Sequence, residues 1–183
     1  MKDIMLDLET LSLDNNAVVV SISAIQFDLT TGEVGKKFEK FLDITEQVVA
    51  GGHISEDTCS WWQSQSAQAR SQLIAKKPVG VVSALKAFNT FLLDCYSNPK
   101  DIRLWGNGIS ADNVWIRNLY QRHLIDFTLP YWCDKDVRTL TGLVEREALS
   151  KIEFIGTKHK GLDDCAHQIK TLHASYNLLR GVK

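Results

Sequence analysis

The sequence predicts an α/β fold in which helices cover a mixed β-sheet. Extended segments rich in β-branched residues come first, and segments with helical periodicity fill most of the remainder. A short apolar segment, residues 101–105, interrupts the helical part as a further strand. Because 183 residues fit around one hydrophobic core, and because no linker, repeat or low-complexity tract divides them, residues 1–183 are expected to form a single domain.

Three antiparallel strands are expected to open the chain. Residues 4–9 form a short apolar run with acids at alternate positions, and residues 17–27 form a longer β-branched run. Residues 28–33 contain a Thr-Gly pair that is typical of a hairpin turn. This turn leads to residues 37–42, where polar and apolar side chains alternate as in a half-buried strand.

The spacing of apolar residues predicts several helices in the rest of the chain. The expected helical segments are 55–74, with Ser55 as the N-cap, and then 78–96, 112–123, 138–149 and 162–179. The last segment has the clearest pattern, with apolar side chains at i, i+3 and i+4 over about five turns. Between these segments, residues 101–105 are expected to form a buried strand that ends before Asn107 and Gly108.

Composition and charge exclude several classes of protein. With 44% hydrophobic residues, 23% charged residues and 3 prolines, the chain is neither disordered nor collagen-like. The formal net charge of −1 argues against coating nucleic acid by bulk charge, but it permits binding of one strand end at a metal site.

The four widely spaced cysteines indicate buried thiols in a reducing compartment. Neither a signal peptide nor a membrane span is evident, so a cytoplasmic protein is expected.

Asp7 and Glu9 form the first pair of candidate functional residues. They are two apart on a predicted strand, so both side chains point to the same face, together with Met5. Burying two like charges is costly unless a cation neutralises them, which favours a metal site. The alternative is an edge strand with a solvated acidic face, and this spacing alone leaves that alternative open.

Three residues later in the chain complete the candidate set. Asp112 opens a predicted helix, where an acid can also serve only as a cap. Asp164 lies in the first turn of the last helix near its packed face, whereas the adjacent Asp163 is expected to be solvated. His159 lies in the loop before that helix, a position where most histidines are ordinary surface residues. The order of all five signature residues is more specific than any one of them.

This order resembles the DEDDh 3′-5′ exonucleases. The matching segments are residues 7–10, residues 107–112 and residues 159–166, and the resemblance extends from Ile4 to about Leu179. Residues 58–65 and 135–139 are similar to a subgroup that includes the phage exonuclease DexA and a mycobacterial exoribonuclease. Membership of the superfamily implies a ribonuclease H-like fold, in which parallel strands follow the three antiparallel ones.

The resemblance also implies a two-metal 3′-5′ exonuclease. Such an enzyme would hydrolyse single-stranded DNA or RNA from the 3′ end and release nucleoside 5′-monophosphates. Carboxylate oxygens suit Mg²⁺ or Mn²⁺, and two ions can neutralise the entering and leaving oxygens. Asp7 is expected to bridge both ions, while Glu9 and Asp164 complete the site that activates water. Asp112 is expected to support the second ion, and His159 to accept the proton of the attacking water.

Substrate contacts are expected close to these acids. The candidate substrate-binding residues are Thr10, Leu11, Trp61, Asn107 and Lys160. Trp61 and Trp62 point about 100° apart on a helix, so at most one can face a base, and packing is the alternative for both. Further phosphate contacts are expected from Arg138 and Lys158.

The chain departs from the superfamily at Ala111, where many members have an aromatic residue, and at residues 11–12, where Leu-Ser replaces Thr-Gly.

Two rival functions remain open at the level of sequence. One is a non-catalytic nucleic-acid-binding or assembly module that retains the fold, and the presence of all five signature residues argues against it. The other is a metal-dependent hydrolase of small phosphodiesters, which would use the same site with a different pocket. The sequence leaves the choice between DNA and RNA open, and related stand-alone enzymes are often homodimers.

Overall fold

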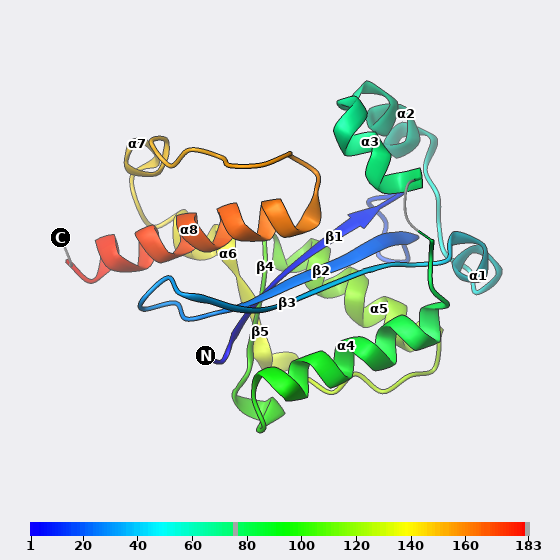
Figure 1. Cartoon of the computed structure of the whole chain (residues 1–183), viewed down its shortest axis with the longest axis horizontal. Coiled ribbons are helices and arrows are strands. Elements are labelled where there is room, and N and C mark those ends of the chain that lie inside the picture. Colours follow the sequence, from blue (N-terminus) through cyan, green and yellow to red (C-terminus); the bar gives the residue numbers. More distant parts are fainter. Residues whose placement is uncertain (75–76, 182–183) are drawn as a thin grey trace.

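A five-stranded mixed sheet forms the centre of the structure, a computed structural model that describes residues 1–74 and 77–181 (Figure 1). The strand order is β3-β2-β1-β4-β5. The first three strands are antiparallel, whereas β4 and β5 run parallel to β1. The strands are β1 (Asp3–Thr10), β2 (Val19–Phe27), β3 (Val34–Phe41), β4 (Arg103–Gly106) and β5 (Asp134–Asp136). The mixed sheet predicted from the sequence is therefore confirmed.

Helices cover both faces of this sheet (Figure 1). α4 and α5 lie on one face, and α6 and α8 lie on the other. The helices are α1 (Ile44–Val49), α2 (Glu56–Ser64), α3 (Ala67–Ile74), α4 (Val81–Cys95), α5 (Val114–Arg122), α6 (Val137–Thr141), α7 (Arg146–Leu149) and α8 (Gly161–Leu179). The α8 helix matches the predicted C-terminal helix almost to the residue.

The alternation of side chains along β1 divides the hydrophobic core into two layers. Leu6 and Leu8 pack with Phe88 under α4 and α5, whereas Met5 packs with Ile169 under α8. Because side chains alternate along a strand, Asp7 and Glu9 share the α8 side with Met5, as predicted. The functional carboxylates of β1 therefore face the N-terminal part of α8.

Two predicted helices are each divided in the structure. The expected helix over 55–74 consists of α2 and α3, because the backbone of Gln65 is extended and Ser66 starts a new helix by accepting the N–H of Ala69. Ser55 caps α2, as predicted. The expected helix over 138–149 consists of α6 and α7, since Gly142 ends α6 after five residues.

The structure also corrects the prediction for the cysteines. Only two of the four free thiols, those of Cys133 and Cys165, are buried, whereas Cys59 and Cys95 are half-buried.

Strand β5 was not predicted because its sequence, Asp-Lys-Asp, has no apolar residue. Helix α1 is a short helix that begins where Asp43 accepts the N–H of Glu46.

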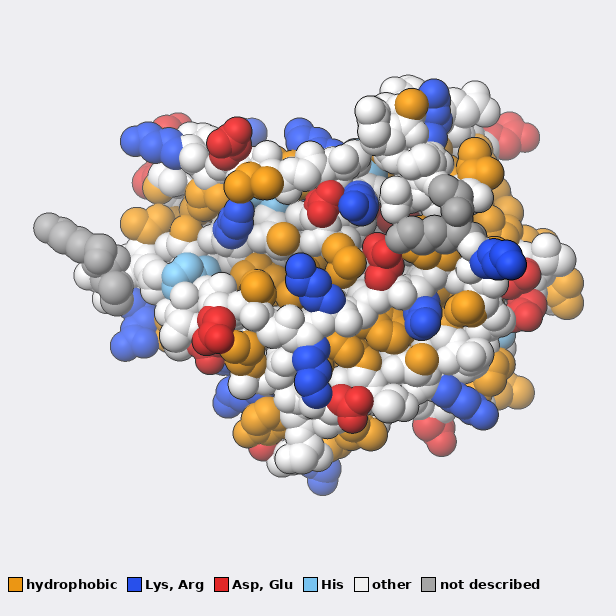
Figure 2. Space-filling model, in the orientation of Figure 1, with side chains coloured by type: hydrophobic (Ala, Val, Ile, Leu, Met, Phe, Trp, Pro, Cys, Tyr) orange, Lys and Arg blue, Asp and Glu red, His pale blue; other side chains and the backbone are white. Residues whose placement is uncertain are grey.

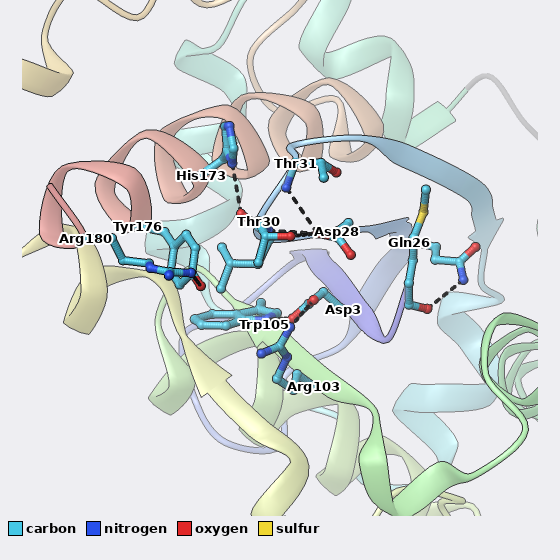
Figure 3. A network of polar contacts seen from close by, with 12 residues as sticks. Asp3, Gln26, Asp28, Thr30, Thr31, Arg103, Trp105, His173, Tyr176 and Arg180 are labelled. Carbon is cyan, nitrogen blue, oxygen red and sulfur yellow. Dashed lines mark hydrogen bonds and ion pairs between the residues drawn. The ribbon is translucent and has the colours of Figure 1, made fainter. Parts of the chain in front are cut away.

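A buried carboxylate ties β1 to its parallel neighbour β4 (Figure 3). Asp3 accepts hydrogen bonds from the guanidinium of Arg103 and from the indole N–H of Trp105, the latter at 2.8 Å. Trp105 is only 6% exposed, in agreement with its predicted place in the core. These bonds fix the register of the two strands that carry the functional residues.

The surface visible in Figure 2 mixes basic and acidic side chains, consistent with the nearly neutral net charge. Within residues 1–74 and 77–181, none of the helices combines the length and apolar character that a bilayer span needs. The homodimer remains a prediction, because the structure contains a single chain. The cytoplasmic location also remains a prediction.

Candidate active site

The close approach of α8 to the sheet brings Asp7 and Asp164 together. A Cβ atom on Gly161, the first residue of α8, would lie 2.3 Å from Oγ of Ser23 and 3.4 Å from Oδ2 of Asp7. Only glycine therefore allows this approach. About two turns further along α8, Gln168 donates a hydrogen bond of 2.8 Å to Oδ1 of Asp7. Asp7 is thus oriented from the same helix that carries Asp164.

Asp112 reaches the same region from β4. It lies in a π-helical turn, Ile109–Asn113, and α5 begins two residues after it at Val114, so the prediction that Asp112 opens the α-helix is wrong by two residues. Its Oδ1 accepts the backbone N–H of Leu8 at 3.0 Å, which anchors it beside the two acids of β1. Gly106 makes this packing possible, because a Cβ atom there would lie 2.2 Å from Oδ1 of Asn113.

His159 is held in a constrained loop above the acids. Its backbone has φ +64°, a left-handed conformation that is uncommon for a residue other than glycine. Its ring packs edge-on against Trp61 and Trp62, with centroids 4.9 and 6.0 Å away. Trp62 is 2% exposed and donates to the carbonyl of Thr10 at 2.9 Å. The tryptophan pair therefore links the histidine loop to the end of β1.

The loop around His159 also corrects one sequence prediction. Asp163, expected to be solvated, is half-buried and accepts the backbone N–H of Thr157 at 3.0 Å. Its carboxyl group lies against Gly156, where φ is +117° and a Cβ atom would meet it at 2.6 Å. Asp163 thus shapes the loop, while Asp164 is left to face the acids of β1.

Three of these side chains offer atoms for one cation. Ligand atoms of Glu9, His159 and Asp164 all lie within 4.8 Å of one another. Among the described residues, the buried Oδ2 of Asp164 has no hydrogen-bond partner. A buried carboxylate oxygen without a donor is costly unless a cation binds it. The donor set is oxygen-rich, which suits a hard divalent ion.

The electrostatics of the acids support this interpretation. Burial, then repulsion from Asp7, Asp164 and Asp112, raises the pKa of Glu9 to about 9. Burial likewise raises the pKa of Asp112 and of Asp164 to about 6 in each case. The pKa of Asp7 is well above its ordinary value, mainly through burial and then through the charges of Asp112 and Asp164. A metal-free site thus holds protons that a bound cation would displace.

A cavity of about 480 Å³ opens beside the acids. Of the predicted substrate-binding residues, Thr10, Trp61 and Asn107 line it. Leu11 and Lys160 are not brought to this cavity, and the ammonium of Lys160 instead lies 3.9 Å from Asp163. Further lining residues are Leu13, Asp57, Thr58, Ala111, Trp115 and Arg138, of which the sequence had indicated only Arg138 as a contact.

The family of Rv2179c-like 3′-5′ exoribonuclease domains matches residues 2–176. The chain belongs to this family. It is therefore a 3′-5′ exonuclease, as the five signature residues had indicated. An exodeoxyribonuclease of Enterobacteria phage T4 is 23% identical over 219 residues, and the match covers 100% of this chain and 92% of the phage protein.

Solved structures of DEDDh exonucleases share the fold of this family member. The nuclease domain of 3′hExo, bound to rAMP, has a TM-score of 0.63 and 14% identity, over 98% of this chain and 92% of that one. Exonuclease I of E. coli, in complex with a dT13 oligonucleotide, has a TM-score of 0.61 and 14% identity. That match covers 97% of this chain and 41% of exonuclease I. The ribonuclease H-like architecture expected from the sequence is confirmed.

Proposed function

We propose that residues 1–183 form one exonuclease domain that removes nucleoside 5′-monophosphates from the 3′ end of single-stranded DNA or RNA. The observation that carries this proposal is the convergence of Asp7, Glu9, Asp112 and Asp164 from β1, from the turn after β4 and from α8. A site of this charge is stable only with protons or cations. Phosphodiester hydrolysis is the chemistry that such a site, joined to a nucleoside-sized cavity, serves best.

Mg²⁺ or Mn²⁺, two ions per site, fits the donor set of this proposal. The four carboxylates would hold them, with Asp7 shared between both, and Asp164 would gain the partner that its Oδ2 lacks. When bound, such ions supply charge neutralisation at the reacting phosphate and a more acidic water. Gln168 contributes by fixing the orientation of the Asp7 carboxylate.

His159 is assigned the role of general base. Burial, then the charge of Lys158, lowers the pKa of His159 below 6.5, so the ring is neutral near pH 7 and can accept a proton. The packing against Trp61 and Trp62 limits the positions that the ring can take. This arrangement lets His159 accept a proton from a water held at the carboxylates.

The cavity beside the acids is assigned to the terminal nucleoside. Its volume of about 480 Å³ lies within the range that encloses a small organic ligand. Trp61 is 42% exposed and lines the cavity, so its ring can stack on a base. Trp62 is buried, and its side chain is assigned a packing role. A cavity for one nucleoside favours attack at strand ends over attack within a strand.

Digestion of end-labelled oligonucleotides tests the proposal. RNA and DNA of equal sequence should be shortened from the 3′ end with Mg²⁺ or Mn²⁺, and the products should chromatograph as nucleoside 5′-monophosphates. Asp7→Asn protein and a chelator are the matched controls. Efficient nicking of a single-stranded circle would contradict the exonuclease assignment. Binding of oligonucleotides without any cleavage would favour the non-catalytic module.

A further inference from the structure

A second cavity adjoins the first at His159. It encloses about 670 Å³, and residues from α7, from the chain between α7 and α8, and from α8 itself line it. Figure 1 shows α7 and the following chain passing over α8. Asn107 and His159 line both cavities, and Asp164 lines the second. The two cavities therefore meet at the carboxylates.

The second cavity differs from the first in its charge. Two cationic side chains, those of Arg146 and Lys158, line it together with the imidazole of His167. Among the described residues, neither Arg146 nor Lys158 has a side-chain ion pair or hydrogen bond. The buried Nδ1 of His167 also has no partner there, and its ring packs on Phe154 with centroids 5.0 Å apart. Unpaired cationic groups beside an aromatic ring suit a polyanion that carries flat bases.

We propose that this cavity, here called the upstream groove (Arg146, Phe154, Lys158 and His167), binds the phosphates that precede the scissile bond. The inference rests on the proposed function. Release of a 5′-monophosphate breaks the bond between phosphorus and the 3′ oxygen of the preceding nucleotide. That nucleotide must leave the carboxylates by a path other than the terminal cavity. The upstream groove is the hollow that continues from Asp164 and His159.

The proposal predicts a dependence on substrate length. A dinucleotide with a 5′-hydroxyl carries only the scissile phosphate, whereas an octanucleotide also carries phosphates that reach the upstream groove. The ratio of kcat/KM for the octanucleotide to kcat/KM for the dinucleotide therefore measures the groove. Because each phosphate contact with a single strand contributes about −0.7 to the slope of log affinity against log salt, the salt dependence of KM measures it independently.

The decisive variant is Arg146→Gln/Lys158→Gln. It should lower the kcat/KM ratio about tenfold and reduce the magnitude of the salt slope for the octanucleotide by about 1.4. Arg146→Gln alone, remote in sequence from His159, should produce about half of the slope change, and Arg146→Lys should restore it. The matched control is Lys86→Gln/Lys100→Gln, which removes two exposed positive charges from outside both cavities and should change neither quantity.

The outcomes separate this inference from the proposed function. An enzyme that cleaves neither substrate with Mg²⁺ or Mn²⁺ contradicts the proposed function itself. An enzyme that cleaves both, with a ratio and slope in the groove variant equal to those of the control, overturns the upstream groove alone. Weaker inhibition by the mononucleotide product with an unchanged ratio would also overturn it, since the groove would then serve product release.

Discussion

At the scale of single residues, Asp7 lies in an environment poorly suited to an uncompensated charge. Its carboxylate is half-buried and close to three other acids, and one hydrogen bond from Gln168 orients it. Asn at this position keeps the shape and the acceptor for Gln168 while removing the charge. The roles of metal ligand and structural element can therefore be separated by this substitution.

Asp7→Asn should reduce turnover by at least about 10²-fold, the scale of loss when one electrostatic contribution to the transition state is removed. The metal-free variant should melt at the same temperature as the native protein or higher, because repulsion with Asp112 and Asp164 is relieved. Single-turnover rates and thermal melts in a chelator measure the two effects. Near-native turnover in a folded variant would argue against a metal role for Asp7.

His159→Ala should lower the rate by about 10² to 10⁴-fold without weakening metal affinity in proportion. In the native enzyme the rate should fall as pH drops through the pKa of His159, which burial holds below 6.5 in the free protein. His159→Asn should behave like His159→Ala. Single-turnover rates across pH, with Mn²⁺ affinity measured separately, provide the test. A rate loss explained wholly by weaker Mn²⁺ binding would make His159 a ligand instead.

At the scale of elements, the position of α8 against β1 and β2 assembles the site. The contact at Gly161 leaves no room for a side chain, so Gly161→Ala should push the start of α8 away from Asp7 and Ser23. We expect destabilisation of about 1–3 kcal/mol, the usual cost of overpacking. Metal affinity should fall with it, since Asp164 moves with α8.

The matched control for this prediction is Gly80→Ala at the start of α4. There a Cβ atom would meet only the flexible carboxylate of Glu46, at 3.3 Å. Chemical denaturation and Mn²⁺ titration of both variants give the comparison. Equal stability and equal Mn²⁺ affinity of the two variants would show that the approach of α8 is not a constraint on the site.

Long periodic elements were predictable from sequence, and short capped ones were not. The apolar pattern of α8 and the β-branched run of β2 predict those elements because burial dictates their side chains. In contrast, the break at Gln65 depends on a backbone torsion and on a cap at Ser66, which periodicity does not report. The π-helical turn that carries Asp112 depends on tertiary contacts to Leu8 and Asp136.

The candidate site divides in the same way. The order of the five signature residues predicted the acids and His159, whereas the cavity walls, such as Leu13 and Trp115, come from segments without a motif. Lys160 shows the limit of proximity in sequence, because it lies beside His159 but is paired with Asp163. The three-dimensional packing decides which basic side chains face the site.

At the scale of the whole molecule, the site makes stability depend on pH and on cations. Folding raises the pKa values of Glu9, Asp112 and Asp164, so the folded protein binds more protons than the unfolded one above about pH 4. This contribution to stability is present at low pH and is lost as pH rises through about 6 and then about 9. A divalent cation replaces the protons and removes the loss.

The Tm of the metal-free protein should therefore fall between pH 6 and pH 9, and Mn²⁺ should raise Tm more at pH 8.5 than at pH 6. Thermal melts in a chelator and in excess Mn²⁺ at several pH values measure this. The Asp7→Asn variant should show a flatter dependence. A metal-free Tm that rises steadily over that range would contradict the burial of coupled acids in one site.

The number of bound ions is the sharpest test of the carboxylate site, because the proposed chemistry needs two divalent cations held by four carboxylates. Titration of the native protein with Mn²⁺ in the presence of a nucleoside 5′-monophosphate, followed by calorimetry and by electron paramagnetic resonance, should give two ions per chain. In Asp7→Asn the titration should show weakened binding of both, because Asp7 is shared. Two unaltered sites in Asp7→Asn, or no Mn²⁺ binding by the native protein, would contradict the account.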